Sequence, residues 1–118
     1  MIYLTGGNGF IGKSIYKFLK MRNLKIVKLK RNYLENLPAL SNEENTLVHC
    51  AWSGIYGSDR KSDKVQEDNL YLTDTIIKVA KYLKINKIIA LGSQAEYGIV
   101  NKKIKEDMVL NPIDPYGI

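Results

Sequence analysis

The chain has 118 residues, about a quarter of them charged, and a formal net charge of +6. A chain of this length forms one domain at most, and it can bury about two-thirds of its unfolded surface. The lysines are scattered and no aromatic stacking motif accompanies them, so the charge indicates solvated faces and not a nucleic-acid surface. One cysteine, Cys50, excludes an internal disulfide, and no apolar run could span a membrane. We expect a cytoplasmic protein that binds neither nucleic acid nor membrane.

A strand, a glycine-rich turn and a helix are predicted at the amino end. Met1 to Leu4 is a short apolar run typical of a buried strand, and Thr5 to Gly12 (TGGNGFIG) follows it. A helical pattern comes next, because apolar residues recur on one face of a 3.6-residue period at Ile11, Ile15, Phe18 and Leu19. This context makes a glycine motif informative, since a phosphate-binding turn needs a strand before it and a helix after it.

The three spaced glycines of the turn have different expected roles. Gly6 can adopt backbone angles that are closed to other residues, and Gly9 lets a diphosphate approach the backbone. Gly12 lets the helix pack closely on the strand. The first amides of the helix are unpaired and carry the positive end of its dipole. Together these features predict an anion site suited to a dinucleotide.

The spacing Gly6-x-x-Gly9-x-x-Gly12 resembles the extended short-chain dehydrogenase/reductase family of nucleotide-sugar epimerases, dehydratases and reductases. We expect an α/β fold with a Rossmann-type, doubly wound parallel sheet of about four strands, in the order second, first, third, fourth. Helices would cover both faces through right-handed crossovers. The resemblance implies that the turn binds the cofactor through Gly6, Gly9, Phe10, Ile11 and Gly12. A tight turn that binds nothing is the alternative.

The second predicted strand, Lys25 to Leu29, is followed by Lys30 and Arg31. In dinucleotide folds an acidic side chain near this point binds the ribose hydroxyls of NAD, whereas an arginine accommodates the 2′-phosphate of NADP. Because two basic residues and no carboxylate stand here, we expect NADP in preference to NAD, with Arg31 as its ligand. The alternative is that both residues are exposed charges at a strand end.

Thr46 to Ala51 predicts a third strand, and Trp52 to Asp59 follows as a glycine-containing loop. Ligands of open parallel sheets bind at the carboxyl ends of the strands. In the resemblance Ala51 and Trp52 match a pair of small residues that lines the cofactor, and the tryptophan departs from that pattern. Trp52 either forms a wall of a sugar-nucleotide pocket or fills the loop against the core. His49 is interpreted as a core histidine.

A long helix is predicted from Ser62 to Leu83. Its buried stripe contains Val65, Leu72, Ile76, Val79, Ala80 and Leu83. Asn69 falls on the same stripe, and a buried amide needs hydrogen-bond partners. The resemblance implies that Asn69 braces the active-site strand ends and gives structural support without taking part in the chemistry.

The fourth predicted strand, Lys87 to Leu91, ends in a segment that resembles the family's serine motif S-S-x-x-x-Y-G. Ser93 stands in the catalytic place, and Gly92 replaces the first serine. Glu96 is unusual there, and it either contacts substrate or is solvated.

Asn111 to Gly117 resembles the segment that carries the family's catalytic tyrosine, here Tyr116. The family motif is Tyr-x-x-x-Lys, and its lysine would fall two residues past Ile118. We therefore expect residues 1–118 to be an incomplete dinucleotide-binding domain, without the substrate domain and inactive alone.

The resemblance implies the cofactor-binding part of an NAD(P)-dependent nucleotide-sugar epimerase, dehydratase or 4-keto reductase. Tyr116 would act as acid or base at the sugar, and Ser93 would form a hydrogen bond to the same oxygen. No metal is expected, the partner is a nucleotide sugar, and a homodimer is possible. The alternatives are a non-catalytic dinucleotide-binding sensor or scaffold and, on charge alone, a nucleic-acid binder.

Overall fold

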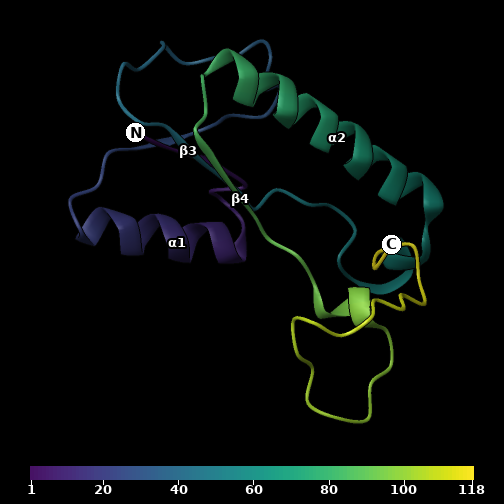
Figure 1. The fold of residues 1–118 in the computed structure, drawn as a ribbon. Helices are drawn as coiled ribbons and strands as arrows, with labels where there is room; N and C mark the ends of the chain where they lie inside the picture. Colours follow the sequence, from purple (N-terminus) through teal and green to yellow (C-terminus); the bar gives the residue numbers. More distant parts are fainter. The chain divides into compact units, whose positions relative to one another are not determined.

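The computed structural model describes all 118 residues, and its chain divides into two compact units. The first, here the sheet unit, comprises Met1–Trp52 and Tyr71–Leu91; the second, the loop unit, comprises Ser53–Leu70 and Gly92–Ile118. Figure 1 shows the ribbon of both. Neither α-helix is both long and apolar enough to cross a membrane.

The sheet unit contains a parallel four-stranded sheet in the order β2-β1-β3-β4, which confirms the predicted order and fold class. Its strands are β1 (Ile2–Thr5), β2 (Ile26–Lys28), β3 (Thr46–His49) and β4 (Lys87–Ala90). In the central strand Tyr3 pairs with Val27 of β2 on one side and with Leu47 of β3 on the other. The observed strands end within two residues of the predicted ones. All four carboxyl ends therefore lie at one edge of the sheet.

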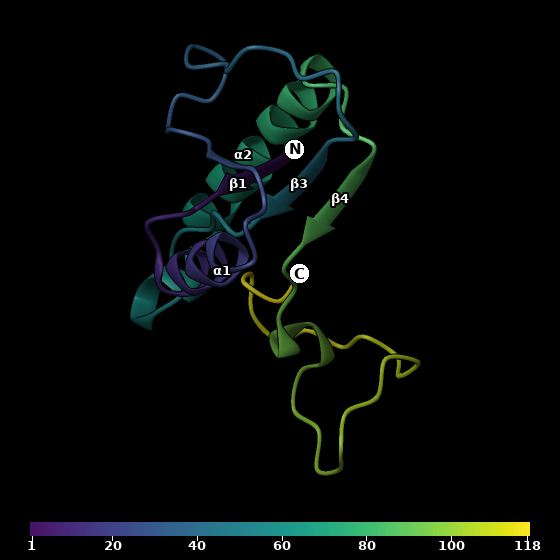
Figure 2. The same cartoon turned by 90° about the vertical axis from the view of Figure 1, so that its left-hand side faces the viewer.

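Helices cover both faces of this sheet, as expected. The helices are α1 (Phe10–Met21) and α2 (Asp63–Tyr82), and only the part of α2 from Tyr71 onward belongs to the sheet unit. Figures 1 and 2 show α1 and this part of α2 on opposite sides of the strands. The main core lies between the sheet and α2. Side chains of a strand alternate between its two faces, and those on the α2 side pack against the helix. It contains Tyr3, Leu29, Tyr33, Leu47, Ile76, Val79, Ala80 and Leu83.

The packing face of α1 differs from the predicted one. Ile11 and Phe18 are 52% and 54% exposed, whereas Gly12 is buried and Ile15 and Leu19 are partly buried. Gly12, Ile15 and Leu19 follow the i, i+3, i+7 spacing of one helical face. The glycine therefore belongs to the packing face, because its missing side chain allows the first turn of α1 to approach the backbone of the glycine turn.

A buried hydroxyl joins the carboxyl ends of β1 and β3. Thr5 Oγ1 accepts hydrogen bonds from the backbone amides of Cys50 at 3.1 Å and Ala51 at 3.2 Å. The same oxygen lies 2.7 Å from His49 Nδ1. Since Thr5 Oγ1 already accepts two bonds, its hydrogen is the one donated to Nδ1, which assigns the proton of the neutral imidazole to Nε2. His49 is thus a core histidine, as predicted, but its Nε2 is buried without a partner.

Replacing Thr5 by valine tests this junction. The change keeps the shape and removes the acceptor of two backbone amides, so we expect a loss of about 1–3 kcal/mol in the free energy of unfolding. Urea unfolding followed by circular dichroism measures it. Thr46→Val is the matched control, because Thr46 lies on the adjoining strand outside this network. Equal effects of the two substitutions would contradict the role of Thr5.

The stability of the fold should also fall on mild acidification. Burial lowers the pKa of His49 below its ordinary value of 6.5, so the unfolded chain binds the proton more readily than the folded one. Stability is therefore full above about pH 6.5 and decreases as the pH falls through the lowered pKa. His49 is the single histidine, and Glu43, whose pKa the hydrogen bond from Lys25 lowers, titrates in a more acidic range. Urea unfolding between about pH 6.5 and 5.5 should show a slope that His49→Gln removes.

Candidate functional site

Two glycines of the turn after β1 are required by the packing of the protein itself. Gly6 has φ +64°, and a Cβ there would lie 2.7 Å from the backbone nitrogen of Ala51. A Cβ on Gly12 would lie 2.1 Å from the carbonyl oxygen of Gly6. No side chain can be placed at either position, so both glycines let three backbone segments approach one another.

Gly9 differs from the other two, because the protein leaves space beside it. A Cβ there would meet only the Gly6 carbonyl oxygen, at 3.3 Å, and the residue is exposed. Gly9 is the N-cap of α1, with no side-chain cap and no acidic residue in the first turn. Phe10, the first helical residue, is 90% exposed. The positive end of the helix is thus open, which fits the diphosphate of a dinucleotide.

A buried tyrosine that the sequence analysis missed lies between the glycine turn and the basic segment after β2. Burial raises the pKa of the Tyr33 phenol, while the Arg31 guanidinium and a hydrogen bond from the Gly6 backbone oppose that rise. Arg31 is therefore close to the tyrosine that contacts the turn, and its own side chain is exposed. The charge of Arg31 therefore acts on a tyrosine that is hydrogen-bonded to the glycine turn, within the same unit.

Ala51 and Trp52 follow β3 at the carboxyl edge of the sheet, where ligands of parallel sheets bind. The Ala51 amide donates to Thr5 Oγ1, and its nitrogen is in contact range of Gly6. Trp52 is 39% exposed. Ala51 is thereby held against the glycine turn by backbone contacts.

In the loop unit Asn69 braces the segment that begins at Ser53. Its Oδ1 accepts from the Ser53 amide and its Nδ2 donates to the Ser53 carbonyl oxygen, both at 2.9 Å. Nδ2 also donates to Gln66 Oε1 at 3.0 Å. Asn69 is 2% exposed, so both ends of a buried amide are satisfied by the backbone of a loop. That it supports an active site stays a prediction.

Ser93 is held by a capping box at the start of the short 3₁₀ helix η2 (Gln94–Tyr97). Its Oγ accepts from the Ala95 amide at 3.2 Å, and Glu96 Oε1 accepts from the Ser93 amide at 2.7 Å. The Ser93 hydroxyl hydrogen remains available to donate to a ligand. Glu96 thus holds the backbone of Ser93. The sequence suggests that Glu96 either contacts substrate or is solvated, and neither alternative includes this bond.

Gly92 and Glu96, the two departures from the serine motif, lie against each other. A Cβ on Gly92 would lie 2.7 Å from Glu96 Oε1, so the carboxylate occupies the space of the missing side chain. A serine at position 92 would require Glu96 to move away from the Ser93 amide.

Tyr116 lies in a turn that packs on η2. The Gly117 amide donates to the carbonyl oxygen of Asp114 at 2.9 Å and to its Oδ1 at 3.1 Å, which closes the turn. A Cβ on Gly117 would lie 2.5 Å from the Ala95 carbonyl oxygen. The turn carrying Tyr116 is therefore in backbone contact with the helix that begins at Ser93.

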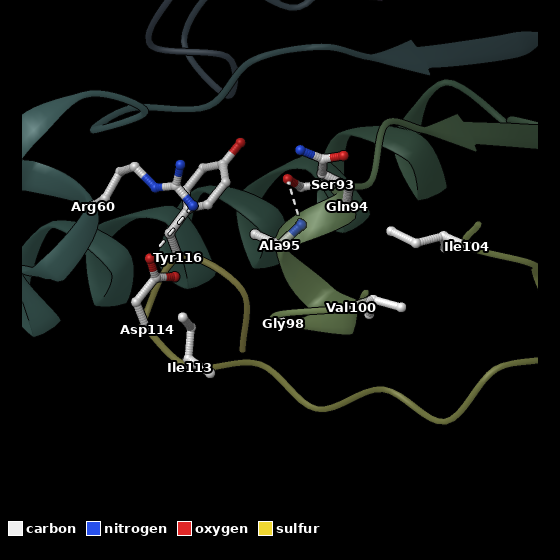
Figure 3. Close-up of a pocket in the computed structure, with 10 residues that line it drawn as sticks. All are labelled: Arg60, Ser93, Gln94, Ala95, Gly98, Val100, Ile104, Ile113, Asp114 and Tyr116. Carbon is white, nitrogen blue, oxygen red and sulfur yellow. Dashed lines mark hydrogen bonds and ion pairs between the residues drawn. The ribbon is translucent and has the colours of Figure 1, made fainter. Parts of the chain in front are cut away.

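Ser93 and Tyr116 line one pocket of about 360 Å³ in the loop unit. In Figure 3 the Tyr116 hydroxyl lies on the edge of the ring turned toward Ser93. The other lining residues are Arg60, Gln94, Ala95, Gly98, Val100, Ile104, Ile113 and Asp114. Arg60 had no signal in the sequence, because it stands in an irregular polar stretch. No cluster of three or more His, Cys, Asp or Glu side chains is arranged to hold a metal ion.

Several known proteins are similar to this chain in sequence or in fold. A dTDP-D-glucose 4,6-dehydratase of Dictyostelium discoideum is 27% identical in an alignment that is 159 positions long. The alignment covers 98% of this chain and 37% of that protein. A solved UDP-glucose 4-epimerase matches with a TM-score of 0.82 at 23% identity, covering 98% of this chain and 43% of that one. RMD from Pseudomonas aeruginosa, complexed with NADPH, matches with a TM-score of 0.76 at 20% identity and the same coverage of both chains.

The chain spans less than half the length of these proteins. The model of one family, described as the NAD dependent epimerase/dehydratase family, matches residues 2–118. The resemblance expected from the glycine turn and the serine segment is thereby confirmed, and the chain belongs to the NAD dependent epimerase/dehydratase family.

Proposed function

We propose that this chain is the cofactor-binding part of an enzyme that alters the sugar of a nucleotide sugar by hydride transfer, as an epimerase, a dehydratase or a 4-keto reductase. The observation that carries the proposal is the single pocket lined by both Ser93 and Tyr116. These are the two residues that the sequence selects for acid–base work, and the turn of one packs on the helix of the other.

The residues of the pocket suit chemistry at a sugar hydroxyl or carbonyl. The Ser93 hydroxyl has a free hydrogen that it can donate to the reacting oxygen, while its backbone is held by Glu96. The Tyr116 phenol would give or take the proton at the same oxygen. The nicotinamide coenzyme, when bound, supplies or accepts the hydride.

The glycine turn would hold the diphosphate of that coenzyme. Gly9 leaves the approach open, and the amides of Phe10 and Ile11 belong to the uncapped first turn of α1. Ala51 and Trp52 would line the coenzyme at the carboxyl edge of the sheet. Arg31, near Tyr33 and the turn, would accept the 2′-phosphate, so we propose NADP in preference to NAD.

Substitutions at Ser93 and Tyr116 test the reaction in the protein expressed from its full reading frame. Ser93→Ala and Tyr116→Phe should each lower kcat by about 100-fold or more, with dinucleotide affinity unchanged. The first removes the hydrogen bond to the reacting oxygen and the second removes proton transfer, and neither alters the glycine turn. Chromatography of nucleotide-hexose products measures turnover. Tyr97→Phe is the matched control, since Tyr97 ends η2 and does not line the pocket.

Full activity of Tyr116→Phe would contradict the proposed reaction. Cofactor binding without turnover of any nucleotide hexose would favour the alternative of a non-catalytic module.

The cofactor preference is tested by Arg31→Ala. Titration calorimetry of the same protein with NADPH and NADH should show tighter binding of NADPH, and the substitution should remove the difference because only NADPH carries the 2′-phosphate. Arg22→Ala, at the end of α1, is the control and should leave the preference intact. Tighter binding of NADH by the unaltered protein would contradict the assignment.

A further inference from the structure

An arginine outside every recognised motif lies against Tyr116. Arg60 belongs to the 3₁₀ helix η1 (Gly57–Lys61) of the loop unit. Its Cζ is 4.5 Å from the centroid of the Tyr116 ring, which is within the range of a cation–π contact. Its Nη2 lies 3.4 Å from Asp114 Oδ2, as the dashed line in Figure 3 shows. One guanidinium therefore contacts both the ring and a carboxylate beside it.

The carboxylate also belongs to the turn that carries the tyrosine. Asp114 Oδ1 accepts from the Gly117 amide at 3.1 Å, while its Oδ2 faces Arg60. Arg60 thus acts on Tyr116 in two ways: directly on the ring face, and through the carboxylate that closes the turn. The contact with Asp114 joins η1 to a residue 54 positions later in the chain, and the contact with Tyr116 joins it to the same turn.

The ion pair with Asp114 favours a role for Arg60 in positioning Tyr116 over a role in binding an anionic ligand. The carboxylate of Asp114 is largely covered and offsets the positive charge, so the pair adds no net charge to the pocket. The Nε of Arg60 is buried and has no hydrogen-bond partner, while the guanidinium contacts the Tyr116 ring and the Asp114 carboxylate. A planar guanidinium can stack on a ring and pair with a carboxylate at once, whereas the compact ammonium of lysine cannot stack in this way.

We propose that Arg60 is the positioning residue of Tyr116: it fixes the orientation of the phenol ring in the pocket that Ser93 also lines. The part of this proposal that concerns catalysis rests on the proposed function, because it requires Tyr116 to be the acid–base residue. The contact itself does not depend on that function and can be measured separately.

Nuclear magnetic resonance of the chain labelled with nitrogen-15 tests the contact. The Nε–H signal of Arg60, assigned by its loss in Arg60→Lys, should be displaced by the ring current of Tyr116. Tyr116→Leu should move this signal toward that of a free arginine, and Tyr116→Phe should not. Arg22 is the internal control, because it stacks on Phe18 at the same 4.5 Å and should not respond to either substitution. An Arg60 signal that Tyr116→Leu leaves in place would overturn the proposal.

Kinetics of the protein expressed from its full reading frame tests the role. Arg60→Lys should lower kcat about ten- to a hundredfold with little change in KM, because a misplaced acid–base group slows the chemical step. In a Tyr116→Phe background the same substitution should cost nothing further, since the group that it positions is already lost. Arg22→Lys should leave kcat unchanged in both backgrounds.

The outcomes separate the two proposals. An Arg60→Lys loss of equal size in both backgrounds would overturn the positioning role and leave the proposed function standing. Full activity of Tyr116→Phe together with a displaced Arg60 signal would overturn the proposed function, and the catalytic role of Arg60 with it.

Discussion

The sheet unit depends on the close approach of three backbone segments at the carboxyl end of β1. The chain turns at Gly6 against the peptide that follows β3, and the first turn of α1 comes down on the Gly6 carbonyl through Gly12. Side chains are excluded at both contacts. The Thr5 hydroxyl, oriented by His49, then joins β1 to the same peptide. Gly6 and Gly12 are both required by these contacts, whereas Gly9 has open space beside it at the uncapped N-terminus of α1. A diphosphate can bind at such a position.

The loop unit contains no strand, so its segments are held together by other contacts. It contains two short 3₁₀ helices and the first part of α2, so its irregular backbone must be held by side chains and close contacts. Asn69 satisfies the loop at Ser53, Glu96 satisfies the amide of Ser93, and Asp114 closes the turn of Tyr116. Each of these polar side chains bonds to backbone, which is how buried irregular segments meet their hydrogen-bond requirement. The result is a pocket lined by Ser93 and Tyr116, both of which stand on braced segments.

Both units use a long side chain from a loop to join parts that are distant in the chain. Tyr33 places its phenol against the backbone of the glycine turn, with Arg31 nearby. Arg60 places its guanidinium on the ring of Tyr116. The match to the family model covers residues 2–118, which include the glycine turn and the serine and tyrosine segments. The Gly92 and Glu96 pair shows how closely such supporting residues depend on one another, since a Cβ at position 92 would lie 2.7 Å from Glu96 Oε1.

The sequence alone determined the strand order, the glycine turn and the candidates Ser93 and Tyr116. These features follow from local rules: the apolar period of each element, the backbone freedom of glycine, and motifs a few residues long. It predicted a packing face of Ile11, Ile15, Phe18 and Leu19, of which Ile15 and Leu19 are partly buried while Ile11 and Phe18 are more than half exposed, because periodicity does not say which residues of a face meet the strand. The partners of Thr5, Tyr33 and Arg60 were decided only by the tertiary structure. Threonine 5 meets a histidine 44 positions away, and Arg60 an aspartate 54 positions away, and no local pattern encodes such contacts.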